Sequence, residues 1–174
     1  MKKQKNYKGF TLLEMLVVVL IIGILAGLAL PKYQMAVTKA KVASILPIMR
    51  RWKDALYEYK LQHGDYCLLD KCRSGIDVNI IETSLPPDWE CNNGDCSSEY
   101  WNSCFLNEET NGDVYCQHLT NGGYFLIAMY QLDDPNEDLR GKIICNAHGT
   151  EGHKVCKALG SKLIDGYNST YSLN

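Results

Sequence analysis

The hydrophobic residues of the chain are concentrated in one run near its amino terminus. From Phe10 to Leu30 every residue is apolar or glycine except Thr11 and Glu14. A helix of about 20 residues, at about 1.5 Å per residue, spans the roughly 30 Å hydrocarbon layer of a bilayer. The pattern therefore predicts a membrane helix over 10–30.

Beyond Pro31 the apolar residues recur at steps of three and four, which is the period of a helix with one apolar face. This stripe consists of Val42, Ile45, Leu46, Met49, Trp52, Leu56 and Tyr59. Charged residues occupy the other faces, namely Lys39, Lys41, Arg50, Arg51, Lys53, Asp54 and Lys60. We expect an amphipathic helix over 31–64 that packs on a globular head, with Gly64 as its C-cap.

Glycine and proline interrupt this long helical pattern at Gly23, Gly27, Pro31 and Pro47. Proline removes a backbone donor and clashes with the preceding turn, so we expect kinks near Pro31 and Pro47. Gly23 marks a second weak point, because glycine lowers helix stability.

The remaining part of the chain, 65–174, leaves about 110 residues for one small globular head. From 65 to about 113 it is rich in Gly, Pro, Asn, Asp and Cys, which predicts loops. Val114–Leu119 and Tyr124–Leu132, joined by 120–123, predict a β-hairpin. Lys142–Cys145 is a third strand candidate, and Leu163–Tyr171 a last edge. The order predicts an α+β fold, with the long helix packed on an antiparallel sheet of three or four strands.

A basic leader precedes the apolar run. It carries Lys2, Lys3, Lys5 and Lys8 and ends at Gly9. A secretory signal peptide would place its small-residue cleavage site after the apolar run, whereas Gly9 lies in front of it. Cleavage at Gly9 would leave the hydrophobic helix on the protein.

This arrangement resembles the prepilin leader of the type IV pilin superfamily, with Gly9, Phe10, Thr11, Leu12 and Glu14 all in register. The resemblance covers roughly the first third of the chain. It implies that a prepilin peptidase removes residues 1–9 by cutting between Gly9 and Phe10 and then methylates the new amino group of Phe10. It also implies that the stretch 23–31 is locally unwound in an assembled filament.

Glu14 is the residue that a simple membrane anchor would not carry. A carboxylate at membrane depth costs several kcal/mol unless it is paired. In the pilin family the corresponding glutamate pairs with the terminal amine of a neighbouring subunit, which here would be that of Phe10. The alternative is that Glu14 lies close enough to the helix start to reach the lipid headgroups.

Net charge and cysteine content limit the function of the head. Removing the four leader lysines changes the formal charge from −2 to −6, and such a surface disfavours general nucleic-acid binding. The basic leader is expected to stay cytoplasmic, so the head is exported. The exported part holds an even number of cysteines, which predicts disulfides in an oxidising compartment. They are Cys67, Cys72, Cys91, Cys96, Cys104, Cys116, Cys145 and Cys156.

The spacing of Cys67 with Cys72, and of Cys91 with Cys96, favours two local loops, while the full connectivity stays open. The pilin resemblance implies a disulfide that closes a C-terminal loop between Cys145 and Cys156. The competing hypothesis is a zinc site formed by these two cysteines with His148 and His153. The acidic run 133–138 invites a calcium hypothesis, but it lacks the EF-hand spacing, and a solvated turn is favoured.

Three functions fit these patterns. The first is a structural, non-enzymatic pilus subunit without a cofactor, used for adhesion, twitching motility or DNA uptake. Its implied partners are related subunits, the prepilin peptidase, the inner-membrane assembly platform and the membrane itself. The precursor would lie in the inner membrane, and the assembled filament would be extracellular. The second is a pseudopilin of type II secretion. The third is a membrane-anchored zinc-binding or enzymatic domain, although the chain carries no phosphate-binding glycine loop and no Gly-x-Ser-x-Gly elbow.

Overall fold

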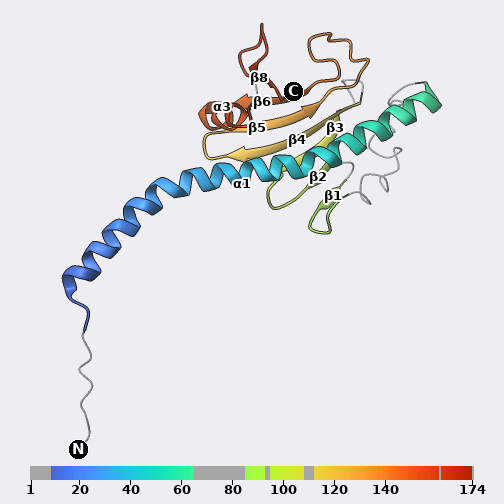
Figure 1. Cartoon of the computed structure of the whole chain (residues 1–174). Coiled ribbons are helices and arrows are strands. Elements are labelled where there is room, and N and C mark those ends of the chain that lie inside the picture. The colour runs from blue at the N-terminus through green and yellow to red at the C-terminus, as the bar shows by residue number, and fades with distance from the viewer. Residues whose placement is uncertain (1–8, 65–84, 93–94, 108–111, 161, 174) are drawn as a thin grey trace, which may run out of the picture. The chain divides into compact units, whose positions relative to one another are not determined.

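The computed structural model describes residues 9–64, 85–92, 95–107, 112–160 and 162–173. The chain divides into two compact units, Met1–Val37 and Thr38–Asn174. One helix, α1 (Leu12–His63), contributes residues to both units, and a sheet with a second helix, α3 (Gly149–Ala158), completes the second unit (Figure 1). The protein therefore has the α+β architecture, with a long helix packed on an antiparallel sheet, that the sequence predicts.

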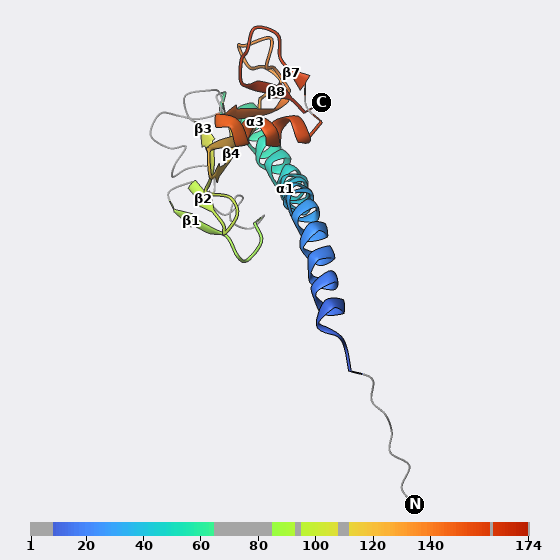
Figure 2. The ribbon, with the colours of Figure 1, turned by 90° about the vertical axis from the view of Figure 1, so that its left-hand side faces the viewer.

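Within the described residues the sheet contains eight strands in the order β1-β2-β3-β4-β5-β6-β8-β7, and each of these pairings is antiparallel. The strands are β1 (Glu90–Asn92), β2 (Asp95–Ser97), β3 (Ser103–Asn107), β4 (Asp113–Thr120), β5 (Gly123–Met129), β6 (Ile143–His148), β7 (Lys162–Leu163) and β8 (Thr170–Ser172). Figure 2 shows β1 and β2 at one end of the sheet and β7 and β8 at the other. The longest strands, β4 and β5, form its middle.

The predicted hairpin is confirmed, since β4 and β5 pair from Val114↔Met129 to Thr120↔Gly123. The third strand candidate and the last edge also form, as β6 and as β7 with β8. The prediction of three or four strands is wrong, because β1, β2 and β3 lie in the stretch expected to be loops. These three strands have only three to five residues each and are largely polar. The alternation of apolar and polar residues in them is therefore too short to predict a strand.

The amphipathic half of α1 buries the predicted stripe. Val42, Ile45, Met49, Trp52 and Leu56 are all buried, whereas Leu46 and Tyr59 are half-buried at its margins. Each fully buried side chain of this kind contributes about 1.5–3 kcal/mol relative to exposure. This burial fixes the second half of α1 to the sheet.

The carboxyl end of α1 is capped as expected. Gly64 adopts a φ of 88°, and its N–H donates to the carbonyl of Lys60 at 2.7 Å. Glycine takes this left-handed conformation without the Cβ clash of other residues. At the other weak points, Gly23, Pro31 and Pro47, the helix continues without interruption, so the unwinding of 23–31 stays a prediction for the assembled filament.

Two polar contacts add to the apolar packing of α1. The buried Gln131, just after β5, donates from Nε2 to the carbonyl of Gly112 at 2.9 Å and to that of Lys53 on α1 at 3.4 Å. Lys60, near the end of α1, forms a salt bridge with Asp133. Both partners come from the segment after β5, which is therefore attached to the helix.

The far side of the sheet has its own core. Tyr115, Ala128 and Ile144 are register neighbours on β4, β5 and β6, and they form a buried cluster with Leu139. Directly opposed residues of antiparallel strands share one face. The sheet is thus covered on this face by the loop that carries Leu139 and on the other by α1.

The disulfide that the pilin resemblance implies between Cys145 and Cys156 is present, and most of the segment that it closes is helical, as α3, and not a loop. α3 packs so closely on β5 that a Cβ on Gly152 would lie 2.2 Å from the carbonyl oxygen of Tyr124. The sequence did not predict this helix, because Gly149 and Gly152 lie in it and glycine disfavours helices. Here the glycine at 152 permits the contact that holds α3.

Candidate functional site

The start of α1 is built around Thr11 and Glu14. The Glu14 carboxylate accepts hydrogen bonds from the Thr11 backbone N–H at 2.8 Å and from its hydroxyl at 2.9 Å. In return the Glu14 N–H donates to Thr11 Oγ1 at 3.2 Å. This reciprocal arrangement is a capping box, which satisfies two backbone N–H groups that a helix start leaves free.

The sequence analysis missed this role of Thr11. The signal was present, because Thr-x-x-Glu directly before an apolar run is the sequence signature of a capping box. Glu14 therefore has an intramolecular partner in the single chain. Any pairing with the amine of a neighbouring subunit has to replace or share these contacts.

Phe10 precedes this cap, and its side chain is 76% exposed. Gly9 is also exposed. The peptide bond that the pilin resemblance assigns to the peptidase thus lies outside the helix, at two exposed residues. The leader lysines at 2, 3, 5 and 8 lie outside the described residues. The cleavage and methylation of Phe10 stay predictions.

From Leu12 to Leu30 the large apolar side chains of α1 are exposed in the single chain. In the described part of the chain α1 alone is long and apolar enough to cross a membrane, by length and composition, and the apolar window near its start has a mean hydropathy of 2.8. A contiguous apolar surface of this extent marks a membrane or protein contact. The helix surface is therefore suited to lipid, to other helices, or to each in turn.

The structure does not offer the two cysteine ligands that the zinc hypothesis requires. Cys145 and Cys156 form a disulfide that joins β6 to α3, so neither sulfur is a thiolate ligand. His153 Nδ1 lies 2.7 Å from the hydroxyl of Tyr171, and His148 packs its ring against Tyr124. Within the residues that the structure describes, no group of three or more His, Cys, Asp and Glu side chains is arranged to hold a metal.

The acidic run 133–138 forms a turn, but not a wholly solvated one. Asp134 is only 3% exposed, and its carboxylate accepts the N–H of Asn136 at 2.7 Å. Arg140 donates from Nε to the backbone carbonyl of Asp134 at 2.8 Å. With Asp133 bound to Lys60, these contacts use the acidic residues to shape the turn and attach it to α1.

The other cysteines of the head that the structure describes are also oxidised. Cys91 bonds to Cys96, and Cys104 bonds to Cys116. Cys67 and Cys72 lie outside the described residues, so their expected pairing stays a prediction. Three disulfides in the described residues agree with an oxidising compartment.

Two tyrosines of the head have perturbed titration. Burial raises the pKa of Tyr130, and its hydrogen bond to Tyr115 and the nearby carboxylates of Asp113 and Asp134 raise it further. Burial also raises the pKa of Tyr100, against a hydrogen bond with Thr38 that lowers it. These hydroxyls stay protonated at neutral pH and act as structural groups.

Comparison with known proteins agrees with the interpretation of the amino-terminal segment as a prepilin-like motif. The family described as "Prokaryotic N-terminal methylation motif" matches residues 4–30. A fimbrial protein of Neisseria meningitidis serogroup B is 44% identical over 59 residues, which are 34% of this chain and 35% of that protein. The resemblance to the type IV pilin superfamily is therefore confirmed.

More distant relatives extend the match. Fimbrial protein EcpB of Eikenella corrodens is 40% identical over 72 residues, which are 41% of this chain and 45% of that protein. Type II secretion system core protein G of Klebsiella michiganensis is 33% identical over 86 residues, 49% of this chain and 58% of that protein. The chain spans about a third of the length of the first fimbrial relatives. No solved structure matches the chain.

Proposed function

We propose, on the premise that the amino terminus is that of a type IV pilin-like protein, that the chain is a structural subunit of a type IV pilus. The observation that carries the proposal is the methylation motif at 4–30, within which residues 12–30 form an exposed apolar helical segment with one carboxylate, Glu14. Cleavage between Gly9 and Phe10 removes the basic leader and creates a positively charged amine four residues from Glu14. The chain has no catalytic role in this proposal.

The charge of Glu14 gives the filament its register. In an apolar surrounding an unpaired carboxylate costs several kcal/mol, so a subunit gains by placing it against the amine of Phe10 in a neighbour. The capping contacts with Thr11 hold the carboxylate until that partner arrives. The apolar side chains of 12–30 then pack against those of other subunits in place of lipid.

The apolar helix and the basic leader indicate where the precursor and the assembled subunit lie. The precursor is held in the inner membrane by α1, with the basic leader on the cytoplasmic side and the head on the periplasmic side. The prepilin peptidase and the inner-membrane assembly platform act on it there, and related subunits join it in an extracellular filament. Opening of α1 between Gly23 and Pro31 accompanies this transfer.

A pseudopilin of type II secretion is the second candidate. The match to a type II secretion core protein covers the larger share of both chains, although at lower identity than the fimbrial matches. The disulfides of the head favour the pilus, because a filament outside the cell is exposed to proteases and shear. Adhesion, twitching motility and DNA uptake remain the functions that such a pilus would serve.

The test is peptide mass spectrometry on filaments sheared from cells that produce the protein. The expected result is a peptide that begins at Phe10 and carries one added methyl group. The same peptide found in the membrane fraction alone favours the pseudopilin. Mature protein that keeps Met1 and the leader overturns both proposals.

A further inference from the structure

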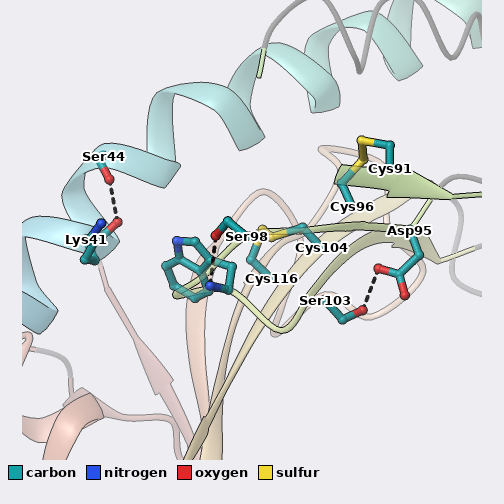
Figure 3. The surroundings of a disulfide bond; sticks show 10 residues. Lys41, Ser44, Cys91, Asp95, Cys96, Ser98, Ser103, Cys104 and Cys116 are labelled. Atoms are coloured by element: carbon teal, nitrogen blue, oxygen red, sulfur yellow. Dashed lines mark hydrogen bonds between the residues drawn. A yellow bond between two sulfur atoms is a disulfide. The ribbon is translucent and has the colours of Figure 1, made fainter. Parts of the chain in front are cut away.

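Four cysteines of the head form a row across neighbouring strands. Cys91 is the register partner of Cys96, Cys96 of Cys104, and Cys104 of Cys116. Directly opposed residues of antiparallel strands project to the same face with Cβ atoms about 4.5–5.5 Å apart. Figure 3 shows the two disulfides, Cys91–Cys96 and Cys104–Cys116, one after the other along this row.

The central pair of the row is not bonded, although it has the same register relation as the bonded pairs. Cys96 and Cys104 face each other across β2 and β3, and each is bonded to its outer neighbour. The row therefore admits a second pairing in which Cys96 bonds to Cys104. The two pairings differ by one exchange between adjacent strands.

Only one end of the row is open to solvent. Cys96, Cys104 and Cys116 are fully buried, whereas Cys91 is half-buried on β1, the edge strand of the sheet. Cys91 also lines a pocket of about 320 Å³ whose other walls are Leu85, Pro86, Pro87 and Trp89. These walls expose polar as well as apolar surface, and they include two proline rings and an indole ring that offer aliphatic and aromatic contacts to a small thiol.

We propose that this row is a thiol–disulfide exchange site that accepts a small external thiol at Cys91. The thiolate attacks Sγ of Cys91, forms a mixed disulfide there and releases Sγ of Cys96 as a thiolate. Cys96 then attacks Sγ of Cys104, forms the Cys96–Cys104 disulfide and releases Cys116. The proton of the incoming thiol ends on Cys116. Two disulfides break and two form. The sulfur of the external thiol is oxidised to the disulfide level and that of Cys116 is reduced to a thiol, so the incoming thiol is the reductant and no further redox partner is needed.

The row has the order of cysteines that the second step requires. Thiol–disulfide exchange is a displacement at sulfur, in which the attacking and leaving sulfur atoms lie on opposite sides of the one attacked. Cys96 and Cys116 flank Cys104 on the two neighbouring strands, which lie about 4.7–4.9 Å to either side of β3. Cys96 and Cys116 therefore lie on opposite sides of Cys104 in the row, which is the order of residues that displacement at Cys104 requires.

The row ends at Cys116, which gives an internal control. The next register partner is Ile127, and beyond it lies Cys145, which is bonded to Cys156 in α3. Ile127 has no sulfur, so exchange cannot pass to Cys145. The Cys145–Cys156 disulfide is fully buried and does not line the pocket.

The test treats the full chain in detergent micelles with benzyl mercaptan, followed by acid quenching, N-ethylmaleimide and peptide mass spectrometry. We expect the benzyl adduct on Cys91, a Cys96–Cys104 cross-link, and maleimide on Cys116. The adduct on Cys91 should exceed that on Cys145 or Cys156 by about tenfold or more, because access limits the exchange of buried disulfides. An adduct on Cys91 with maleimide on Cys96 and an intact Cys104–Cys116 disulfide overturns the relay. No adduct on Cys91, or equal labelling of Cys145, overturns the site.

Two variants sharpen the result. In the double variant Cys104→Ser/Cys116→Ser the adduct on Cys91 should form, and the maleimide should move to Cys96. In Trp89→Ala the pocket loses its aromatic wall, and the adduct on Cys91 should form several-fold more slowly. Since the cross-link is measured on the unaltered chain, the proposal stays decidable if the double variant fails to fold. The outcome is also independent of filament assembly.

Discussion

Thr11 and Glu14 hold each other at the first turn of α1, through two hydrogen bonds into the carboxylate and one back to the Thr11 hydroxyl. The charge that we assign to filament assembly is therefore also part of a helix cap. The two roles make different demands. Capping needs an oxygen that accepts hydrogen bonds, whereas pairing with an amine needs a negative charge.

Glu14→Gln separates these roles, because glutamine accepts the same hydrogen bonds from Thr11 without the charge. We expect the helix content of the purified chain, measured by circular dichroism, to be unchanged. Loss of one partner of a desolvated ion pair costs about 3 kcal/mol, which is a roughly hundredfold drop in assembly. The yield of sheared filaments measures it.

Thr11→Val is the matched control for this experiment. It removes the hydroxyl contacts of the cap and costs about 1 kcal/mol of helix stability, but leaves the charge of Glu14 in place. Filament yield should fall far less than in Glu14→Gln. Wild-type yield from Glu14→Gln would show that capping alone explains the glutamate.

Leu56→Ala should destabilise the head strongly. Leu56 is 1% exposed at the contact of α1 with the sheet, and removal of a buried leucine side chain costs about 2–5 kcal/mol. Leu61→Ala, in the same helix, is the control, because Leu61 is 70% exposed and should change the free energy of unfolding by less than about 0.5 kcal/mol. Urea unfolding of both variants compares them, and equal effects would contradict the packing of α1 described above.

The three disulfides should differ in their contribution to stability. In the chain-entropy view the longer loops, of 12 residues for Cys104–Cys116 and 11 for Cys145–Cys156, contribute about 3 kcal/mol each. The five-residue loop of Cys91–Cys96 contributes about 2 kcal/mol. Double serine variants of each pair, unfolded in urea, should follow this order. A Cys91/Cys96 variant that loses the most stability would contradict it.

Gly152→Ala should destabilise the protein although alanine is the better helix former. The gain in helix propensity is about 1 kcal/mol, but the new methyl group would lie 2.2 Å from the backbone oxygen of Tyr124. Overpacking of this kind costs about 1–3 kcal/mol and moves α3 away from β5. The thermal unfolding midpoint should therefore fall.

Gly122→Ala provides the comparison for this variant. A Cβ at that position would meet only the flexible Glu151 side chain, at an ordinary contact distance of 3.6 Å. Its midpoint should stay close to that of the unaltered chain. A rise in the midpoint of Gly152→Ala would show that α3 can shift at little cost.

Stability should fall at high pH through Tyr130. Its pKa is raised in the folded state, so above the ordinary value of 10.0 the unfolded chain loses this proton first and is favoured. The contribution is intact below pH 10 and is lost as pH rises beyond it. Tyr130→Phe removes the titratable hydroxyl, so the free energy of unfolding of this variant should decline less steeply between pH 9 and about 11. Parallel curves for the two proteins would contradict the assignment.

Much of the fold was readable from local patterns. The stripe from Val42 to Leu56, the C-cap at Gly64 and the hairpin of β4 and β5 each depend on residues close together in the chain. Helix periodicity and turn chemistry are local properties, so a short window of sequence carries them. The same holds for the amino-terminal motif from Gly9 to Glu14. The capping box of Thr11 and Glu14 is also local, so its sequence signature could have predicted it.

The tertiary structure decided what depends on pairing between distant segments. β1, β2 and β3 are short and polar. They become strands because β4 offers β3 a ladder of hydrogen bonds, after which β3 pairs with β2 and β2 with β1. α3 is a helix, despite two glycines, because Gly152 allows it to lie against Tyr124. Strand register alone places Cys91, Cys96, Cys104 and Cys116 in one row.

The sequence by itself thus determined the long helix, its apolar surface and the charge at its start, because helices are specified by neighbours along the chain. It left the order of the strands and the full connectivity of the cysteines open, since these follow from contacts between residues far apart in sequence. Such contacts depend on how the whole sheet assembles, and many sequences of equal composition would satisfy the local rules. The charge of Glu14, to which we assign filament assembly, is a property of the sequence, whereas the row of Cys91, Cys96, Cys104 and Cys116 exists only in the folded protein.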